Sequence, residues 1–152
     1  MKIVEFLRAD AVIANLSGQT GPAVLGELCR PIAAAQRMDA QRLVDTLLDR
    51  EKLGSTGIGE GVAIPHGKMP GLPGLVASFG RSTAGVDFRA IDGRPTHLFL
   101  ALLAPESAGA EHLQALARAS RLLKRPAFRQ ALLDAPYAAE MYRLVVEEDR
   151  QL

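Results

Sequence analysis

Hydrophobic and polar positions along the chain fall into two alternating patterns. Apolar residues recur at helical spacing in four stretches, which predicts helices at residues 21–36, from 40 to about 52, from 111 onward and at 137–148. Pro126 is placed to open a further helix, because proline is favoured in a first turn. Shorter apolar runs separate these stretches. The alternation of helix-like and strand-like segments favours an α/β domain.

The shorter apolar runs predict strands at residues 12–16, 62–64, 75–80 and 97–104. The last run is almost entirely apolar, as expected for a central strand that is covered on both faces. Residues 54–61 contain four glycines and predict a loop. That loop leads directly into the short strand at 62–64.

Single residues refine these boundaries. Pro31 should kink or shorten the first helix, because it lacks an N–H group and clashes with the preceding turn. Asp39 is a candidate N-cap for the second helix, and Gly54 is a candidate left-handed residue after its end. The sequence Ile-Asp-Gly-Arg at 91–94 predicts a turn between two strands.

Composition narrows the class of protein. The 152 residues are 48% hydrophobic, enough for one sizeable core, and we expect one domain over residues 1–152. A formal net charge of only +1 argues against a general nucleic-acid binder. Only one cysteine, Cys29, is present, and neither a long apolar run nor a signal-like start is found. A reducing, cytoplasmic setting without membrane insertion is therefore expected.

Glycines crowd between Gly54 and Gly67, and backbone amides in such loops can approach a phosphate closely. Two phosphate-binding motifs nevertheless fail. A P-loop ending at Gly67-Lys68 needs glycine at position 62 and a hydroxyl residue at 69, where Val62 and Met69 stand. The dinucleotide-binding pattern also needs glycine at position 62. The glycines therefore do not indicate nucleotide binding.

His66 lies between Pro65 and Gly67 at the end of a short apolar run. Pro65 restricts the backbone, and Gly67 leaves room beside the ring. A neutral imidazole is abundant at pH 7, and it can attack phosphorus and carry the phosphoryl group as a phosphoramidate. The residue types alone also allow a loop histidine that is merely hydrogen-bonded to a neighbouring carbonyl group.

Four further residues could support a phosphoryl group on His66. His112 falls in the first turn of a predicted helix, where free amides favour a neutral ring and attract anions. The Arg50 guanidinium could clamp phosphoryl oxygens, and Ser55 and Thr56 could donate hydroxyl hydrogen bonds. The alternatives are a surface histidine, a solvated charge at a helix end and hydroxyl groups that only cap a turn.

His97 and Cys29 are better explained structurally. His97 lies at the start of a predicted strand with its polar end near solvent, and Cys29 falls within the apolar pattern of a helix. Three histidines and one cysteine without a recognised ligand spacing do not predict a zinc site.

Residues 50–68, REKLGSTGIGEGVAIPHGK, closely resemble the signature of enzyme IIA proteins of the fructose/mannitol class in the bacterial phosphotransferase system. Residues 82–93, 98–105 and 111–116 agree with the same family, so the resemblance covers nearly the whole chain. The sequence Gly-Ile-Gly at 57–59 is more similar to the nitrogen-regulatory branch than to the mannitol branch.

The resemblance implies a three-layer α/β/α sandwich around a mixed, five-stranded sheet. It also implies that His66 is phosphorylated on a ring nitrogen by a small histidine-containing phosphocarrier protein, with Arg50 and His112 lining the same site. Sugar-specific members pass the phosphoryl group to a membrane-coupled IIB unit. Nitrogen-regulatory members mainly control partners such as potassium transporters and sensor kinases. A single domain without an attached IIB unit favours the regulatory role.

We therefore expect a nitrogen-regulatory phosphocarrier with phosphotransferase chemistry. It needs no metal and no cofactor, because its donor is already activated. The donor is expected to meet an apolar rim around the histidine, made of Val62, Ile64, Met69 and Leu72. The alternatives are a sugar-specific IIA protein that relays phosphate to a IIB domain and a binding module that is never phosphorylated.

Overall fold

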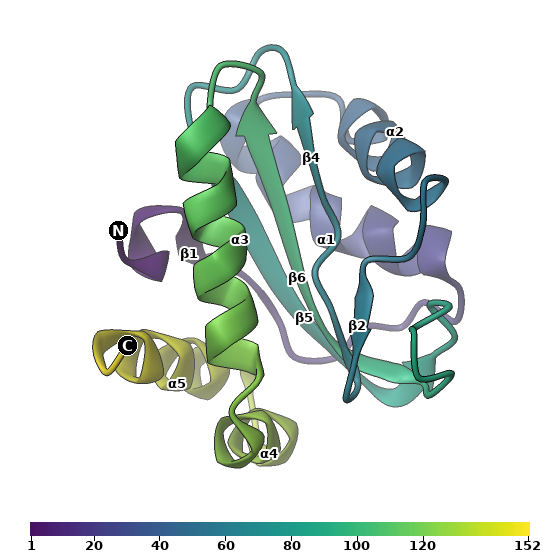
Figure 1. Ribbon diagram of the computed structural model, residues 1–152, viewed down its shortest axis with the longest axis vertical. Coiled ribbons are helices and arrows are strands. Elements are labelled where there is room, and N and C mark those ends of the chain that lie inside the picture. The colour runs from purple at the N-terminus through teal and green to yellow at the C-terminus, as the bar shows by residue number, and fades with distance from the viewer.

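The sheet lies in the middle of the molecule and contains six strands (Figure 1). In the computed structural model, which describes residues 1–152, five strands follow the order β1–β5–β6–β3–β2, and β4 pairs with β6. β6 runs parallel to β3 and β4 but antiparallel to β5, so the sheet is mixed, as expected. The expectation of five strands omits one segment. The strands are Leu7–Ile13 (β1), Gly57–Gly59 (β2), Val62–Ala63 (β3), His66–Met69 (β4), Val76–Val86 (β5) and Thr96–Pro105 (β6).

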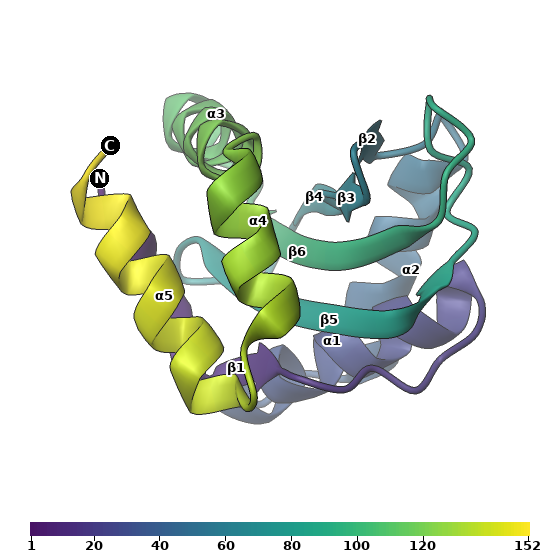
Figure 2. The same cartoon turned by 90° about the horizontal axis from the view of Figure 1, so that it is seen from below.

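Helices cover both faces of this sheet. α1 (Gly21–Gln36) and α2 (Ala40–Glu51) pack on one face. α3 (Gly109–Leu123), α4 (Pro126–Asp134) and α5 (Ala138–Arg150) pack on the other. Figure 2 shows the sheet between the two groups, which confirms the three-layer α/β/α arrangement. None of these helices combines the length and apolar character that crossing a membrane requires.

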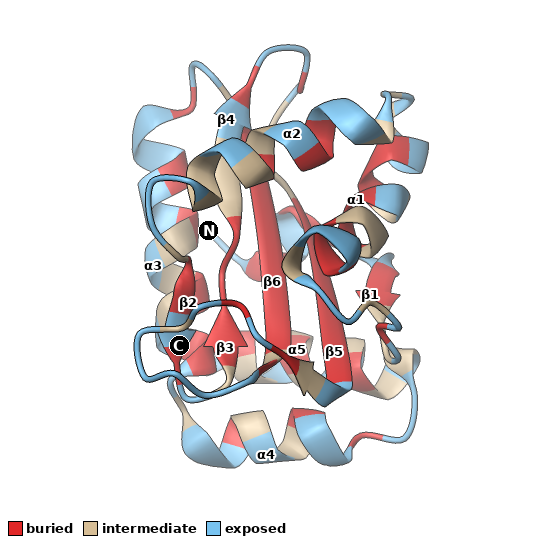
Figure 3. Ribbon diagram, turned by 90° about the vertical axis from the view of Figure 1, so that its right-hand side faces the viewer, coloured by how far each residue is buried: buried red, intermediate tan, exposed pale blue.

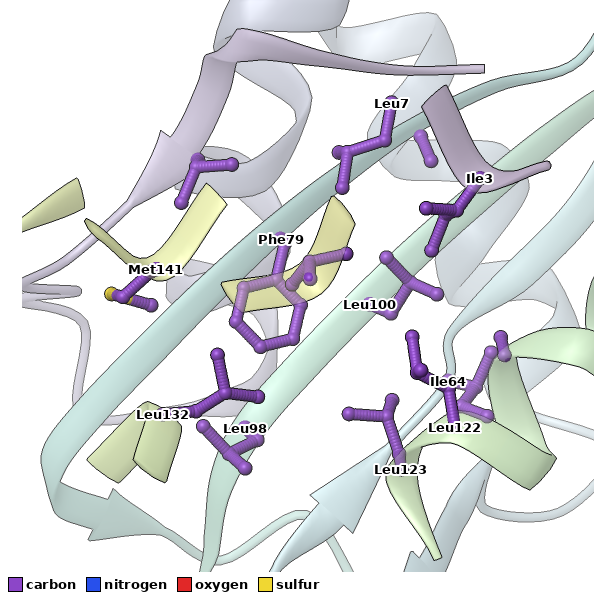
Figure 4. Packing of buried hydrophobic residues seen from close by; sticks show 14 of the residues in the cluster. Ile3, Leu7, Ile64, Phe79, Leu98, Leu100, Leu122, Leu123, Leu132 and Met141 are labelled. Atoms are coloured by element: carbon purple, nitrogen blue, oxygen red, sulfur yellow. The ribbon is translucent and has the colours of Figure 1, made fainter. Parts of the chain in front are cut away.

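Side chains of β6 alternate between two hydrophobic cores, one under each helical layer. Leu98, Leu100 and Leu102 face α3, α4 and α5, whereas Phe99 and Leu103 face α1 and α2. Figure 3 shows β6 buried along nearly its whole length, and Figure 4 shows side chains of the first of these cores, among them Leu98 and Leu100 of β6. Burying each such side chain stabilises the fold by roughly 1.5–3 kcal/mol. The predicted central position of this strand is confirmed.

Two strands extend further than the sequence pattern predicted, because polar residues interrupt their apolar runs. β1 begins at Leu7 rather than Val12, since Arg8 and Asp10 lie exposed on an edge strand, and it ends at Ile13, short of the predicted end at Leu16. β5 continues past Gly80 through the buried residue Arg81. The Arg81 guanidinium donates hydrogen bonds to backbone carbonyl oxygens at the ends of other elements, those of Ala14, Leu132 and Ala135.

The helix boundaries agree more closely with the sequence pattern. α1 has the predicted bounds, and Pro31 does not shorten it, because Ile32 and Ala33 in the next turn are held in the core. The Asp39 carboxylate caps α2 by accepting a hydrogen bond from the Gln41 amide at 3.0 Å. Gly54 does adopt a positive φ after α2, but its value of +141° lies outside the left-handed helical region that was predicted.

β3 and β4 form one interrupted strand along β6. β3 pairs with the beginning of β6 and β4 with its end, both in parallel. In the interruption, the Pro65 carbonyl oxygen accepts a hydrogen bond from the Leu102 amide at 2.8 Å, and the Ile64 amide donates to the Thr56 carbonyl oxygen at 3.0 Å. His66 is the first residue after the break. The stretch predicted as a loop around His66 is therefore tied to the sheet on both sides of this residue.

Candidate functional site

The His66 ring is half-buried and is held by the backbone two residues before it. Its Nδ1 atom lies 2.7 Å from the Ile64 carbonyl oxygen. A carbonyl oxygen only accepts hydrogen bonds, so Nδ1 carries the proton and Nε2 keeps a free lone pair. Burial lowers the pKa of His66, and the Arg50 charge lowers it further, although the hydrogen bond to Ile64 acts in the opposite direction. The neutral, nucleophilic form therefore prevails at pH 7.

His112 faces His66 from the first turn of α3. The two ring centroids are 5.6 Å apart and the rings are tilted by 52°. His112 is only 6% exposed, and its buried Nδ1 atom has no hydrogen-bond partner. Burial lowers the pKa of His112, and positive charge on His66 and Lys68 lowers it further. A buried polar atom without a hydrogen-bond partner lowers the stability of the fold by about 1–3 kcal/mol. Atoms of this kind occur more often at functional sites than elsewhere.

Arg50 lies in the last turn of α2. Its Nη1 atom donates a hydrogen bond to the Gly54 carbonyl oxygen at 2.8 Å. This contact is typical of a charged residue at a helix C-terminus. It is one of the two roles that the sequence allowed for Arg50, the other being a clamp for phosphoryl oxygens. The guanidinium is also close enough to His66 to lower its pKa. The His66 ring thus lies near Arg50 of α2 and faces His112 of α3.

The hydroxyl groups of Ser55 and Thr56 are engaged elsewhere. Ser55 Oγ donates to the Phe88 carbonyl oxygen at 2.6 Å. Thr56 is 4% exposed, and its hydroxyl donates to the Glu51 carboxylate, which also accepts from the Thr56 amide at 3.2 Å. These contacts match the alternative in which both hydroxyls stabilise the turn. Glu51, which no sequence pattern singled out, fixes this turn, and its negative charge raises the pKa of His66.

Gly67 has a different role from the one suggested by the sequence. A Cβ atom at this position would lie 2.8 Å from Thr46 Cγ2, so the glycine allows α2 to pack directly on β4. The space beside Gly67 is therefore filled by a helix side chain and is not open to the His66 ring.

The predicted apolar rim is wrong. Val62, Ile64, Met69 and Leu72 are between 1% and 7% exposed, and all four belong to the two cores. Short strand segments buried on both faces explain the error, because their apolar side chains are needed inside the sandwich. Leu113, which follows His112 in the sequence, does reach the surface and is 68% exposed.

Cys29 and His97 are kept away from the imidazole pair. Cys29 lies in the α1 core, and burial raises the pKa of its thiol to about 12, so it is no thiolate nucleophile at pH 7. His97 Nδ1 is hydrogen-bonded to the Ser82 carbonyl oxygen at 2.9 Å, which agrees with a structural role. No cluster of three or more His, Cys, Asp or Glu side chains is arranged to hold a metal ion.

A cavity of about 770 Å³ lies between the N-terminus of α1, the outer side of α2 and residues 87–89. Glu51 and Ser55 line this cavity, but neither His66 nor His112 does. The imidazole pair lies instead where the first residue of β4 faces the first turn of α3. We place the candidate site at the pair, because the nucleophilic nitrogen and the unpaired buried nitrogen are there.

Comparisons with a family model, with known proteins and with solved structures all point to the same protein family. The family described as phosphoenolpyruvate-dependent sugar phosphotransferase system, EIIA 2, matches residues 5–148. A nitrogen regulatory protein of Bradyrhizobium diazoefficiens is 42% identical over 124 residues, which are 82% of this chain and 81% of that protein. The fructose-specific EIIABC component of Bacillus subtilis is 36% identical over 151 residues, which are 99% of this chain but 24% of that protein. Nitrogen regulatory protein IIA-Ntr from Neisseria meningitidis has a crystal structure that matches with a TM-score of 0.88 at 31% identity, covering 94% of this chain and 98% of that one.

The fold and the match over residues 5–148 define a phosphocarrier domain of the phosphotransferase system, and the chain belongs to the EIIA type-2 family. Within this family it is similar to nitrogen regulatory proteins, and also to a fructose-specific component. The resemblance drawn from residues 50–68 is thereby confirmed at the level of the family.

Proposed function

We propose that His66 accepts a phosphoryl group on Nε2 from the phosphohistidine of a histidine-containing phosphocarrier protein. The observation that carries this proposal is the 2.7 Å contact between Nδ1 and the Ile64 carbonyl oxygen, because it leaves Nε2 as the nucleophilic atom. The lowered pKa of His66 keeps that atom unprotonated near pH 7.

The transfer is an in-line displacement at phosphorus. A bond forms between Nε2 of His66 and the phosphorus atom while the bond between phosphorus and the donor histidine breaks, and its electron pair returns to the donor ring. The imidazole of His66 gains positive character in this step, which the Ile64 carbonyl oxygen stabilises through Nδ1–H. Arg50 and His112 stabilise negative charge on the transferred oxygens, so that catalysis is positioning and electrostatics.

Regulation follows from the charge that is added. A phosphoryl group brings about −1.5 to −2 charge to one place on the surface, which is enough to make or break contact with a partner protein. We infer a nitrogen-regulatory phosphocarrier in the cytoplasm whose partners, such as potassium transporters or sensor kinases, respond to this charge. The similarity to nitrogen regulatory proteins supports this role.

The test is phosphorylation by the upstream carriers with phosphoenolpyruvate as the phosphate source, followed by intact-mass measurement. The wild-type chain is expected to gain one acid-labile phosphoryl group. His66→Ala should gain none while keeping its circular dichroism spectrum, and His97→Ala, the matched histidine control, should be labelled like the wild type. Normal labelling of His66→Ala would refute the proposal, and an unlabelled wild-type chain would leave only a binding module.

A second candidate function is relay of the phosphoryl group to a sugar-specific IIB domain. The similarity to a fructose-specific EIIABC component over 151 residues supports it. Labelled chain can be mixed with a purified IIB domain of the fructose class. Rapid transfer, together with neighbouring sugar-permease genes, would favour the relay, whereas neighbouring nitrogen sigma-factor genes and no transfer would favour regulation.

A further inference from the structure

The register of β4 against β6 sorts its side chains between the two faces of the sheet. His66 pairs with Leu102 and Lys68 pairs with Ala104, two residues further along β6. Paired residues of neighbouring strands project to the same face, and alternate residues share a face. Leu102 belongs to the core under α3, so His66 and Lys68 both project toward α3. Gly67, between them, faces Thr46 of α2.

Lys68 is exposed and unpaired. Its ammonium group takes part in none of the ion pairs or side-chain hydrogen bonds of residues 1–152, unlike Lys52, which pairs with Asp49 at 3.2 Å. No fold-stabilising contact accounts for a lysine side chain at this position. The same ammonium lies close enough to His112 to lower the pKa of that histidine.

Each ring of the imidazole pair therefore has a cation acting on it. Arg50 acts on His66, and Lys68 acts on His112. The negative charge that acts on His66, that of Glu51, is committed to the amide and hydroxyl groups of Thr56. Two cations and a bare Nε2 atom are complementary to an oxyanion.

We infer that Lys68 is an oxyanion-binding residue of this site, which holds a phosphate group beside His112 while Arg50 holds it from the side of α2. A lysine ammonium offers three hydrogen-bond donors and binds phosphate as a point charge, whereas arginine binds it through a planar fork. This inference deepens the proposed function and rests on it for the identity of the phosphate group as one carried by His66. The site itself binds phosphate whether or not transfer takes place.

The test is titration of the full chain with inorganic phosphate, followed by NMR signals of the His66 and His112 rings. The wild-type chain should show saturable shifts of both rings. Lys68→Gln should weaken the affinity roughly fivefold, as expected for loss of one partly exposed charged contact. Lys68→Arg should retain most of it. Lys124→Gln, which removes an exposed lysine at the other end of α3, should bind phosphate like the wild type.

Equal affinity of Lys68→Gln and the wild type, an equal loss in Lys124→Gln, or no saturable binding at all would overturn the inference. Phosphorylation assays on the same variants separate it from the proposed function. Binding that depends on Lys68 in a chain that is never phosphorylated would refute the proposed function and leave the inference standing. Normal phosphorylation, together with phosphate binding that is unchanged in Lys68→Gln, would refute the inference and leave the proposed function standing.

Discussion

Nδ1 of His66 donates its hydrogen bond to the carbonyl oxygen of Ile64, on the other side of Pro65 in the break between β3 and β4. A backbone oxygen atom therefore selects the tautomer of the ring. Because this oxygen belongs to the main chain, substituting another side chain does not remove the hydrogen bond directly. Such a contact between a histidine and a backbone carbonyl is a common way of fixing which nitrogen is free.

This geometry predicts the tautomer of His66 in solution. Nitrogen-15 NMR of the imidazole at pH 7.5 should show a protonated Nδ1 and an unprotonated Nε2, and phosphorylation should shift the Nε2 resonance. His66→Gln removes these signals and so assigns them. A ring protonated on Nε2 at pH 7.5 would contradict the proposed nucleophile.

Arg50→Gln is expected to act on both the pKa of His66 and the rate of transfer. Loss of the positive charge should raise the pKa of His66, since that charge lowers it in the native chain. The rate of phosphorylation should fall about tenfold or more, because one charge-stabilising donor is lost. The pKa is measured by NMR titration of the ring. Arg42→Gln, an exposed position earlier on α2, is the control and should change neither quantity.

The lowered pKa values of His66 and His112 predict a loss of stability at mildly acidic pH. Both histidines titrate near pH 6.5 when unfolded and at lower pH when folded, so the unfolded chain binds more protons as the pH falls. Their contribution to the free energy of unfolding is full above this value and decreases as the pH falls below it. Urea unfolding should therefore give a smaller free energy at pH 5.5 than at pH 7.5. The double variant His66→Gln/His112→Gln should show a clearly smaller decrease, and an unchanged decrease would refute this account.

Gly67→Ala should destabilise the fold by about 1–3 kcal/mol, because its Cβ atom would overlap Thr46 Cγ2. Thr46→Ser removes that methyl group and keeps the hydroxyl that donates to the Arg42 carbonyl oxygen at 2.9 Å. The double variant Gly67→Ala/Thr46→Ser should therefore recover most of the loss in urea unfolding. If Thr46→Ser gave no recovery, the packing of α2 on β4 would not be the reason for this glycine.

The sequence predicted well those elements whose pattern reflects one buried face. α1, α2 and β6 lie where apolar spacing placed them, because their cores require that spacing. β2 and β4 were missed as strands, since neither shows apolar alternation: β2 is three residues long with two glycines, and of the four residues of β4 only Met69 is buried. Tertiary pairing with β3 and β6, rather than local preference, makes these segments strands.

The sequence motif predicted the candidate residues of the site but not the contacts that these residues make. Local residue types made His66, Arg50 and His112 candidates, and the family resemblance implied that they line one site; in the structure His112 faces His66, and Arg50 is near enough for its charge to act on that ring. The link between Glu51 and Thr56 could not be foreseen, because either hydroxyl in the turn could have pointed elsewhere. Lys68 carried no signal as an exposed lysine, until the register of β4 showed which face it shares with His66.

The interrupted strand formed by β3 and β4 restricts how a partner protein can approach His66. Because hydrogen bonds to β6 hold the backbone on either side of this residue, the histidine is not mounted on an arm that can swing from donor to recipient. Under the proposed function, every protein that gives, takes or senses the phosphoryl group would have to approach His66 in this one fixed position. A bound donor would then compete directly with the recipient and with any regulated partner.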